Sequence, residues 1–114
     1  MDEDKEAARK LNLAANLNLA ACYLKTKDYR KAIESCEKSI SIDEKNEKGH
    51  FRMGQAYLGL AEYDDAIKAF GKVVEINGEN KEAINSISLC RQKIKESHEK
   101  EKALYSKMFS ALSK

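Results

Sequence analysis

The feature that most limits how this chain can fold is an internal match: two stretches align with each other at an offset of 34 residues. Residues of similar size and chemistry recur at this offset. The aligned pairs are Leu19 and Met53, Ala20 and Gly54, Tyr23 and Tyr57, Leu24 and Leu58, Tyr29 and Tyr63, Ala32 and Ala66, Ile33 and Ile67, Lys38 and Lys72, Ile42 and Ile76, and Asn46 and Asn80. A fixed period of this length is typical of stacked repeats, each packing on its neighbours. Such arrays rarely perform chemistry, and their curved surfaces hold other proteins.

The composition is that of a helical protein with balanced charge. The 114 residues include no proline and only five glycines, which favours helix along most of the chain. The 21 basic and 19 acidic residues leave a net charge of +2, which argues against nucleic acid or a membrane surface as partner. No apolar run approaches the ~18 residues of a membrane span. The three cysteines, odd in number and widely spaced, favour a reducing cytoplasmic or nuclear compartment.

Apolar residues spaced three and four apart predict an all-α protein of about five helices. The expected helices cover residues 4–26, 29–42, 47–60, 63–76 and about 80–112. Short connections predict two antiparallel helix pairs followed by one long helix. Gly78 is expected to end the fourth helix in the left-handed backbone conformation.

Small residues are expected where paired helices cross closely, because a bulkier side chain there would cost about 1–3 kcal/mol. These residues are Ala20, Ala32, Gly54 and Ala66. The residues expected to pack the last helix onto the fourth are Ala83, Ile84, Ile87 and Ile94. Beyond Ser97, the last helix is expected to leave the core.

The second repeat unit carries the clearest family pattern. Met53 and Gly54 are followed by Tyr57, Ala66 and Phe70, and this spacing resembles that of the tetratricopeptide repeat (TPR) family. The positions that depart from the pattern are Cys36, Glu44, His50 and Gly78. The resemblance implies helix-turn-helix units over residues 13–46 and 47–80, stacked as a right-handed superhelix. A capping helix with a polar tail is expected over 81–114. Residues 1–114 would then be a partial TPR domain, with the opening helix of the first repeat absent.

Three further segments are similar to one group within this family. The runs AANLNLAACYLK, NEKGHFRMGQAYL and KALYSKMF resemble the C-terminal region of the large FKBP-type immunophilins, which are peptidyl-prolyl isomerases and co-chaperones of heat-shock protein 90. The resemblance implies a protein-binding module for the acidic C-terminal tail of that chaperone. It also implies that the isomerase activity belongs to a separate domain, so this chain is expected to be neither an enzyme nor dependent on a cofactor.

The expected binding residues follow from their positions in the repeat. The second and sixth positions of a unit face the concave groove, which selects Asn18 in the first unit and Lys48 and Arg52 in the second. Lys48 and Arg52 are four residues apart, so they project from one helical face and suit a carboxylate. Phe51 and Gln55 are also expected to line the groove. The alternative is an ordinary solvated helix face.

The resemblance implies that these residues are part of a carboxylate clamp that holds a Met-Glu-Glu-Val-Asp tail. The full clamp has five polar residues, and two of them come from the helix expected to be absent. We therefore expect peptide binding to be weakened by a few kcal/mol.

Two other functions remain open at the sequence level. The last helix combines several lysines with Leu104, Met108, Phe109 and Leu112, a pattern seen in calmodulin targets, although a solvated helix would also explain it. The resemblance likewise implies a calmodulin site there. An uncovered apolar face around Leu11, Leu13 and Leu17 would favour self-association.

The sequence offers little support for catalysis. His50 and His98 stand in no metal-binding or triad spacing, and no phosphate-binding glycine loop is present. Cys22 and Cys36 fall on apolar helix faces, where buried and unreactive thiols are expected.

Overall fold

The computed structural model describes residues 2–113, which form five α-helices and no β-strand. The helices are α1 (Asp2–Lys25), α2 (Tyr29–Ile42), α3 (Glu47–Gly59), α4 (Tyr63–Ile76) and α5 (Lys81–Leu112). These bounds lie within two residues of the sequence-based ones, and the all-α prediction is confirmed.

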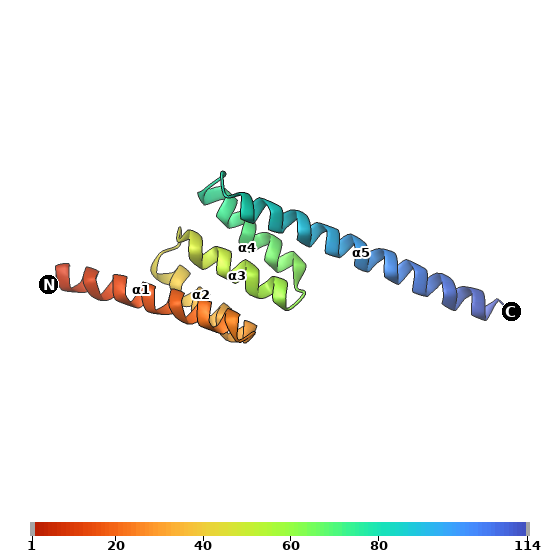
Figure 1. Ribbon diagram of the computed structural model, residues 1–114, viewed down its shortest axis with the longest axis horizontal. Coiled ribbons are helices and arrows are strands. Elements are labelled where there is room, and N and C mark those ends of the chain that lie inside the picture. Colours follow the sequence, from red (N-terminus) through yellow and green to blue (C-terminus); the bar gives the residue numbers. More distant parts are fainter. Residues whose placement is uncertain (1, 114) are drawn as a thin grey trace.

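The helices stack in chain order (Figure 1). α1 pairs with α2 and α3 pairs with α4, while α3 also packs on α2 and α5 packs on α4. The radius of gyration is 18.8 Å, well above the roughly 13 Å of a compact domain of this length. The reason is that both ends project: the first turns of α1 extend beyond α2 and the second half of α5 leaves the stack, so the two termini lie at opposite ends of the molecule (Figure 1).

The core has two clusters of buried side chains. One consists of Ala66, Phe70, Val73, Ala83 and Cys90, between α4 and α5, and the other of Ala32, Ile33 and Ala56, between α2 and α3. Every described residue from Ser97 onward is exposed, which confirms that α5 leaves the core there. No described helix is both long enough and apolar enough to span a membrane.

The expected packing of α5 was wrong at one position. Ile84 is 43% exposed, whereas Ala83 and Cys90 are fully buried and Ile87 packs beside them. Residues 83, 87, 90 and 94 follow one helical stripe at spacings of four, three and four. Ile84 lies one residue, or about 100° of helical rotation, away from that stripe.

The turns inside the two helix pairs repeat the 34-residue period. Lys27 and Ala61, 34 residues apart, both have a left-handed backbone, with φ of 62° and 58°. Directly after them, the backbone N–H of Asp28 donates to the carbonyl of Tyr23 at 2.8 Å. The equivalent bond joins Glu62 to the carbonyl of Tyr57 at 2.9 Å. Both helix pairs are therefore closed by the same turn.

The expectation for Gly78 was wrong. No described glycine has a positive φ. α4 ends instead at Asn77, which has an extended backbone, and its side chain accepts a hydrogen bond from the N–H of Glu79 at 3.1 Å. This side-chain turn reverses the chain without a left-handed residue.

Close approach of the paired helices is confirmed at Gly54. A Cβ atom on Gly54 would lie 2.7 Å from the Phe70 ring, which is fully buried between α3 and α4. A Cβ atom on Gly59 would likewise clash with the ring of Tyr29 at the start of α2. These glycines allow α3 to lie against α4 at one position and against α2 at the other.

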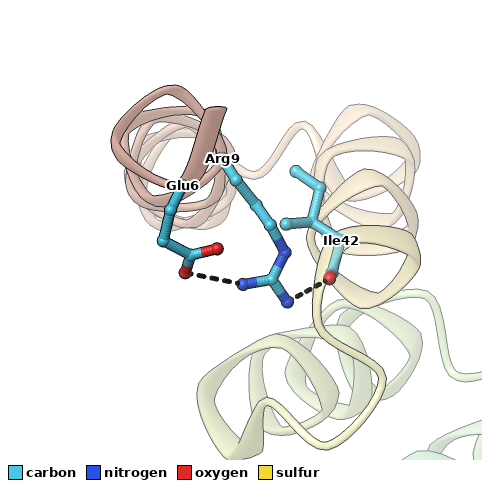
Figure 2. A network of polar contacts seen from close by, with 3 residues as sticks. All are labelled: Glu6, Arg9 and Ile42. Carbon is cyan, nitrogen blue, oxygen red and sulfur yellow. Dashed lines mark hydrogen bonds and ion pairs between the residues drawn. The ribbon is translucent and has the colours of Figure 1, made fainter. Parts of the chain in front are cut away.

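Polar contacts fix the outer parts of the stack. Figure 2 shows Arg9, which donates to the carbonyl of Ile42 at 2.8 Å and to the carboxylate of Glu6 at 3.3 Å. Because Ile42 is the last residue of α2, its carbonyl has no partner further along the helix. Arg9 therefore joins the N-terminal half of α1 to the end of α2.

Candidate functional site

A surface depression of about 320 Å³ lies between α3 and the start of α5. Its lining residues are Glu47, Lys48, Phe51, Arg52 and Gln55 from α3, and Asn80 and Glu82 from the start of α5. It contains two of the three predicted peptide-binding residues and both of the additional residues expected in the groove. Charged groups of both signs line it.

The sequence of α3 explains how these side chains come together. Asn46 caps the helix by accepting a hydrogen bond from the N–H of Gly49 at 2.9 Å. From there, Lys48, Arg52 and Gln55 follow at spacings of four and three, which keeps them on one face. The Lys48 side chain is exposed and makes no hydrogen bond or ion pair within residues 2–113. Its ammonium group is therefore available to an anion.

Arg52 is partly committed to the fold. It is half-buried, and its Nη1 donates to the carbonyl of Leu17 on α1 at 2.8 Å. The guanidinium group has five N–H donors, so most of them remain for a ligand. Arg52 thus fixes its own position by bonding α1 while it lines the depression from α3.

Asn18 stands next to this contact. It is exposed on α1, and its backbone nitrogen is bonded to the Leu17 carbonyl group that Arg52 reaches. Asn18 is not among the residues that line the depression. Lys48 and Arg52 therefore share one site, with Asn18 at the same level of the neighbouring helix. The role of all three in peptide binding stays a prediction.

Phe51 supplies an apolar surface between the charges. Its ring is half-buried and packs edge-on against Phe70, with centroids 5.4 Å apart and planes at 67°. Because Phe70 is fully buried, Phe51 is held from beneath and offers one side of its ring to the depression. A bound side chain could therefore contact an ordered apolar group here.

Sequence reasoning missed the two acidic residues of this site. The Glu47 carboxylate accepts hydrogen bonds from the side-chain amides of Asn77 at 2.8 Å and Asn80 at 3.1 Å. These bonds lower the pKa of Glu47, and the bond from Asn80 has the larger effect. The carboxylate therefore stays charged. Glu82 lies in the first turn of α5. The repeat could have identified it, because Glu82 is 34 residues after Lys48.

The cysteines differ from one another. Cys36 is fully buried, and burial raises the pKa of its thiol to about 12, although the charge of Arg52 acts in the opposite direction. Cys22 was expected to be buried as well, but it is exposed. Cys36 therefore fits the expectation of a buried thiol, and Cys22 does not.

His50 has a structural contact. It is buried, and its Nε2 lies 2.8 Å from the carbonyl of Glu44, so this nitrogen carries the proton and donates. Residues 2–113 contain no group of three or more His, Cys, Asp or Glu side chains placed to hold a metal ion.

The stacked-helix fold agrees with comparisons to known proteins. A family model described as "Anaphase-promoting complex, cyclosome, subunit 3" matches residues 6–73, more than half of the chain. The chain belongs to this family of TPR proteins. It is 45% identical over 111 residues to the peptidyl-prolyl cis-trans isomerase FKBP4 of Bos taurus, a match covering 97% of this chain. The chain spans about a quarter, 24%, of that relative.

Solved structures show the same fold. The C-terminal TPR-containing domain of an FK506-binding protein from Plasmodium falciparum matches with a TM-score of 0.73 and 35% identity, covering 80% of this chain and 60% of that one. The Hsp90 co-chaperone Cns1 from Saccharomyces cerevisiae matches with a TM-score of 0.84 and 31% identity, covering 90% and 33%. The second TPR domain of human RPAP3, in complex with the HSP70 peptide SGPTIEEVD, matches with a TM-score of 0.67 and 28% identity. This match covers 69% of this chain and 66% of that one.

Proposed function

We propose that this chain is the protein-interaction module of an immunophilin-like co-chaperone, and that its groove binds the acidic C-terminal tail of heat-shock protein 90. The observation that carries the proposal is the pairing of Lys48 and Arg52 in one depression, with the Lys48 ammonium group free of any partner among the described residues. Asn18 would add an amide donor from α1.

The chemistry of the site suits such a tail. Hydrogen bonds from ammonium and guanidinium groups to carboxylates are worth about 1.5–3 kcal/mol each. A peptide ending in Glu-Glu-Val-Asp offers three side-chain carboxylates and the terminal one. The related RPAP3 domain holds an HSP70 peptide with this ending, which supports an acidic tail as the ligand class.

The proposal assigns no chemistry to this chain. The isomerase activity in the name of the Bos taurus relative would belong to the part of that protein outside the matched quarter. Three free cysteines fit a cytoplasmic or nuclear protein, and we propose this location.

Calorimetric titration of the chain with the peptide Met-Glu-Glu-Val-Asp tests the proposal. We expect Lys48→Ala to raise Kd about tenfold or more, because one charge-assisted bond of at least ~1.4 kcal/mol is lost. Amidation of the peptide C-terminus should weaken binding similarly. Lys38→Ala, an exposed lysine on α2, is the matched control and should leave Kd unchanged. Equal Kd values for Lys48→Ala and Lys38→Ala would reject the proposed site.

A second candidate function rests on the projecting part of α5. Its exposed apolar residues are Leu104, Tyr105, Met108, Phe109 and Leu112, and lysines surround them. Such a basic amphipathic helix suits calmodulin or a second copy of the chain. Calcium-dependent co-elution with calmodulin that Met108→Glu abolishes would favour the first. A sedimentation coefficient that rises with protein concentration would favour the second.

A further inference from the structure

The repeat places opposite charges at equivalent positions of α3 and α5. Lys48 and Glu82 are 34 residues apart, and each lies in the first turn of its helix, two residues after a capping asparagine. The two caps are also equivalent, since Asn46 accepts from Gly49 N–H at 2.9 Å and Asn80 from Ala83 N–H at 3.0 Å. Equivalent positions of stacked helices face the same surface.

The structure agrees that Lys48 and Glu82 share a surface, because both line the 320 Å³ depression. Glu82 is exposed and, like Lys48, makes no hydrogen bond or ion pair within residues 2–113. Glu47 differs, because the amides of Asn77 and Asn80 already hold its carboxylate. Glu82 is therefore the acidic group of the depression that remains available to a ligand.

The charges are ordered across the molecule. Arg52 lines the depression from α3 and is hydrogen-bonded to α1, while Glu82 lies on α5, on the other side of α3 in the stack. An extended peptide with its acidic end at Lys48 and Arg52 would therefore have its preceding residues near α5. Lys48 and Glu82 line the same depression, so one short extended peptide could reach both side chains.

We infer that Glu82 determines specificity at this site by favouring acidic C-terminal peptides that carry a cationic residue shortly before the acidic block bound by Lys48 and Arg52. This inference rests on the proposed function. A groove with only cationic residues would accept any acidic tail, whereas this groove would distinguish tails by the charge before the acidic block. Glu82 would act by contact with the ligand.

Glu82 also has an ordinary structural role, since a carboxylate in the first turn of a helix interacts favourably with the helix dipole. The test must therefore compare two peptides on the same protein, so that any change in the stability of α5 cancels. The peptides are SGPTIEEVD and the same peptide with arginine in place of its threonine.

Titration calorimetry at low salt gives the ratio of the two Kd values for each protein. We expect the unsubstituted chain to bind the arginine peptide about threefold more tightly, as for an exposed ion pair. Glu82→Gln should bring the ratio to one, and Glu82→Lys should reverse it. Glu79→Gln, an exposed acidic residue outside the depression, is the matched control and should keep the ratio.

The outcomes separate the two proposals. A ratio of one in the unsubstituted chain, or a ratio unchanged by Glu82→Gln, would overturn the role of Glu82 while leaving the peptide site in place. If neither peptide binds and Lys48→Ala changes nothing, the proposed function fails and the role of Glu82 with it. If Glu79→Gln removes the preference for the arginine peptide as fully as Glu82→Gln does, the preference reflects net charge. That result would also overturn the role of Glu82.

Discussion

The two repeat units have the same helices and turns but bury equivalent positions differently. Cys22 on α1 is exposed, whereas Ala56, 34 residues later on α3, is fully buried. The reason is the place of each helix in the stack: α3 packs on both α2 and α4, while α1 packs mainly on α2. The repeat pattern thus determines which way a side chain points, and the neighbouring units determine whether it is covered.

The units also fill their helix crossings with different pairs of residues. The second unit combines Gly54 with Phe70, and the first has Ala20 and Cys36 at the same positions. All four are buried. In the second unit a larger residue on one helix faces a smaller one on the other, whereas the first unit pairs two small residues. The crossing is filled in both units, but by different pairs.

The largest expected difference between the units concerns a buried charge. Ala56→Glu places a carboxylate between α2 and α3, where it would be without a partner, and should lower the free energy of unfolding by about 4 kcal/mol or more. Cys22→Glu at the equivalent position should change it by less than about 0.5 kcal/mol, because that side chain meets solvent. Urea denaturation followed by circular dichroism measures both. If both variants lose a similar free energy of unfolding, the position of a helix in the stack does not determine whether its side chains are buried.

A smaller effect is expected at the helix crossing of the second unit. Gly54→Ala should destabilise the protein by about 1–3 kcal/mol, because the added Cβ would meet the buried Phe70 ring at 2.7 Å. Gly71→Ala on α4 is a matched control with the opposite expected sign. No atom lies within 4 Å of its added Cβ, so the better helix propensity of alanine should stabilise by about 0.5–1 kcal/mol.

A double variant sharpens this comparison. Gly54→Ala with Phe70→Cys gives the second unit the residue pair of the first. Phe70→Cys alone should cost about 3 kcal/mol by leaving a cavity. With the ring removed, Gly54→Ala should no longer destabilise the protein. The double variant should therefore lose less free energy of unfolding than the two single variants lose in sum. Strict additivity in denaturation would show that the ring is not what excludes alanine.

The smallest expected difference concerns the helix caps. Asn46→Ala and Asn80→Ala each remove an N-cap and should cost about 1 kcal/mol. Asn80→Ala should cost more at pH 7, because Asn80 also donates to Glu47.

The pH dependence should separate the two caps. The folded-state pKa of Glu47 is lowered, so its bonds stabilise above the unfolded value of about 4.3, and this contribution is lost as the pH falls through the lowered pKa. Thermal unfolding at pH 7 and at acid pH should show the cost of Asn80→Ala decreasing and that of Asn46→Ala staying constant. If the stability cost of Asn80→Ala is the same at pH 7 and at acid pH, the hydrogen bond to Glu47 does not contribute to it.

Most of the architecture could be predicted from the sequence, because the 34-residue match fixes both period and register. The helix bounds, the close approach at Gly54 and the departure of α5 after Ser97 all follow from local pattern. The same register placed Lys48 and Arg52 on one face, and both line one depression.

The errors have physical causes that pattern alone does not reveal. Gly78 was expected to end α4 in the left-handed conformation, but the helix is followed by an extended Asn77 whose side chain accepts a local hydrogen bond. Cys22 and Ile84 were expected to be buried, but a hydrophobic helix face is buried only where another helix lies against it. Contacts of long side chains, such as Arg9 with Ile42, join residues 33 apart and leave no periodic signal.

The continuity of α5 has a consequence for the order of its exposed half. Forming the first turn of a helix is the unfavourable step, and adding residues to an existing helix is much easier. The part of α5 that packs on α4 provides that first turn, so residues after Ser97 need only extend it. The projecting helix would then be more ordered than the same peptide in isolation, and loosening α5 from α4 would also melt the exposed segment beyond it.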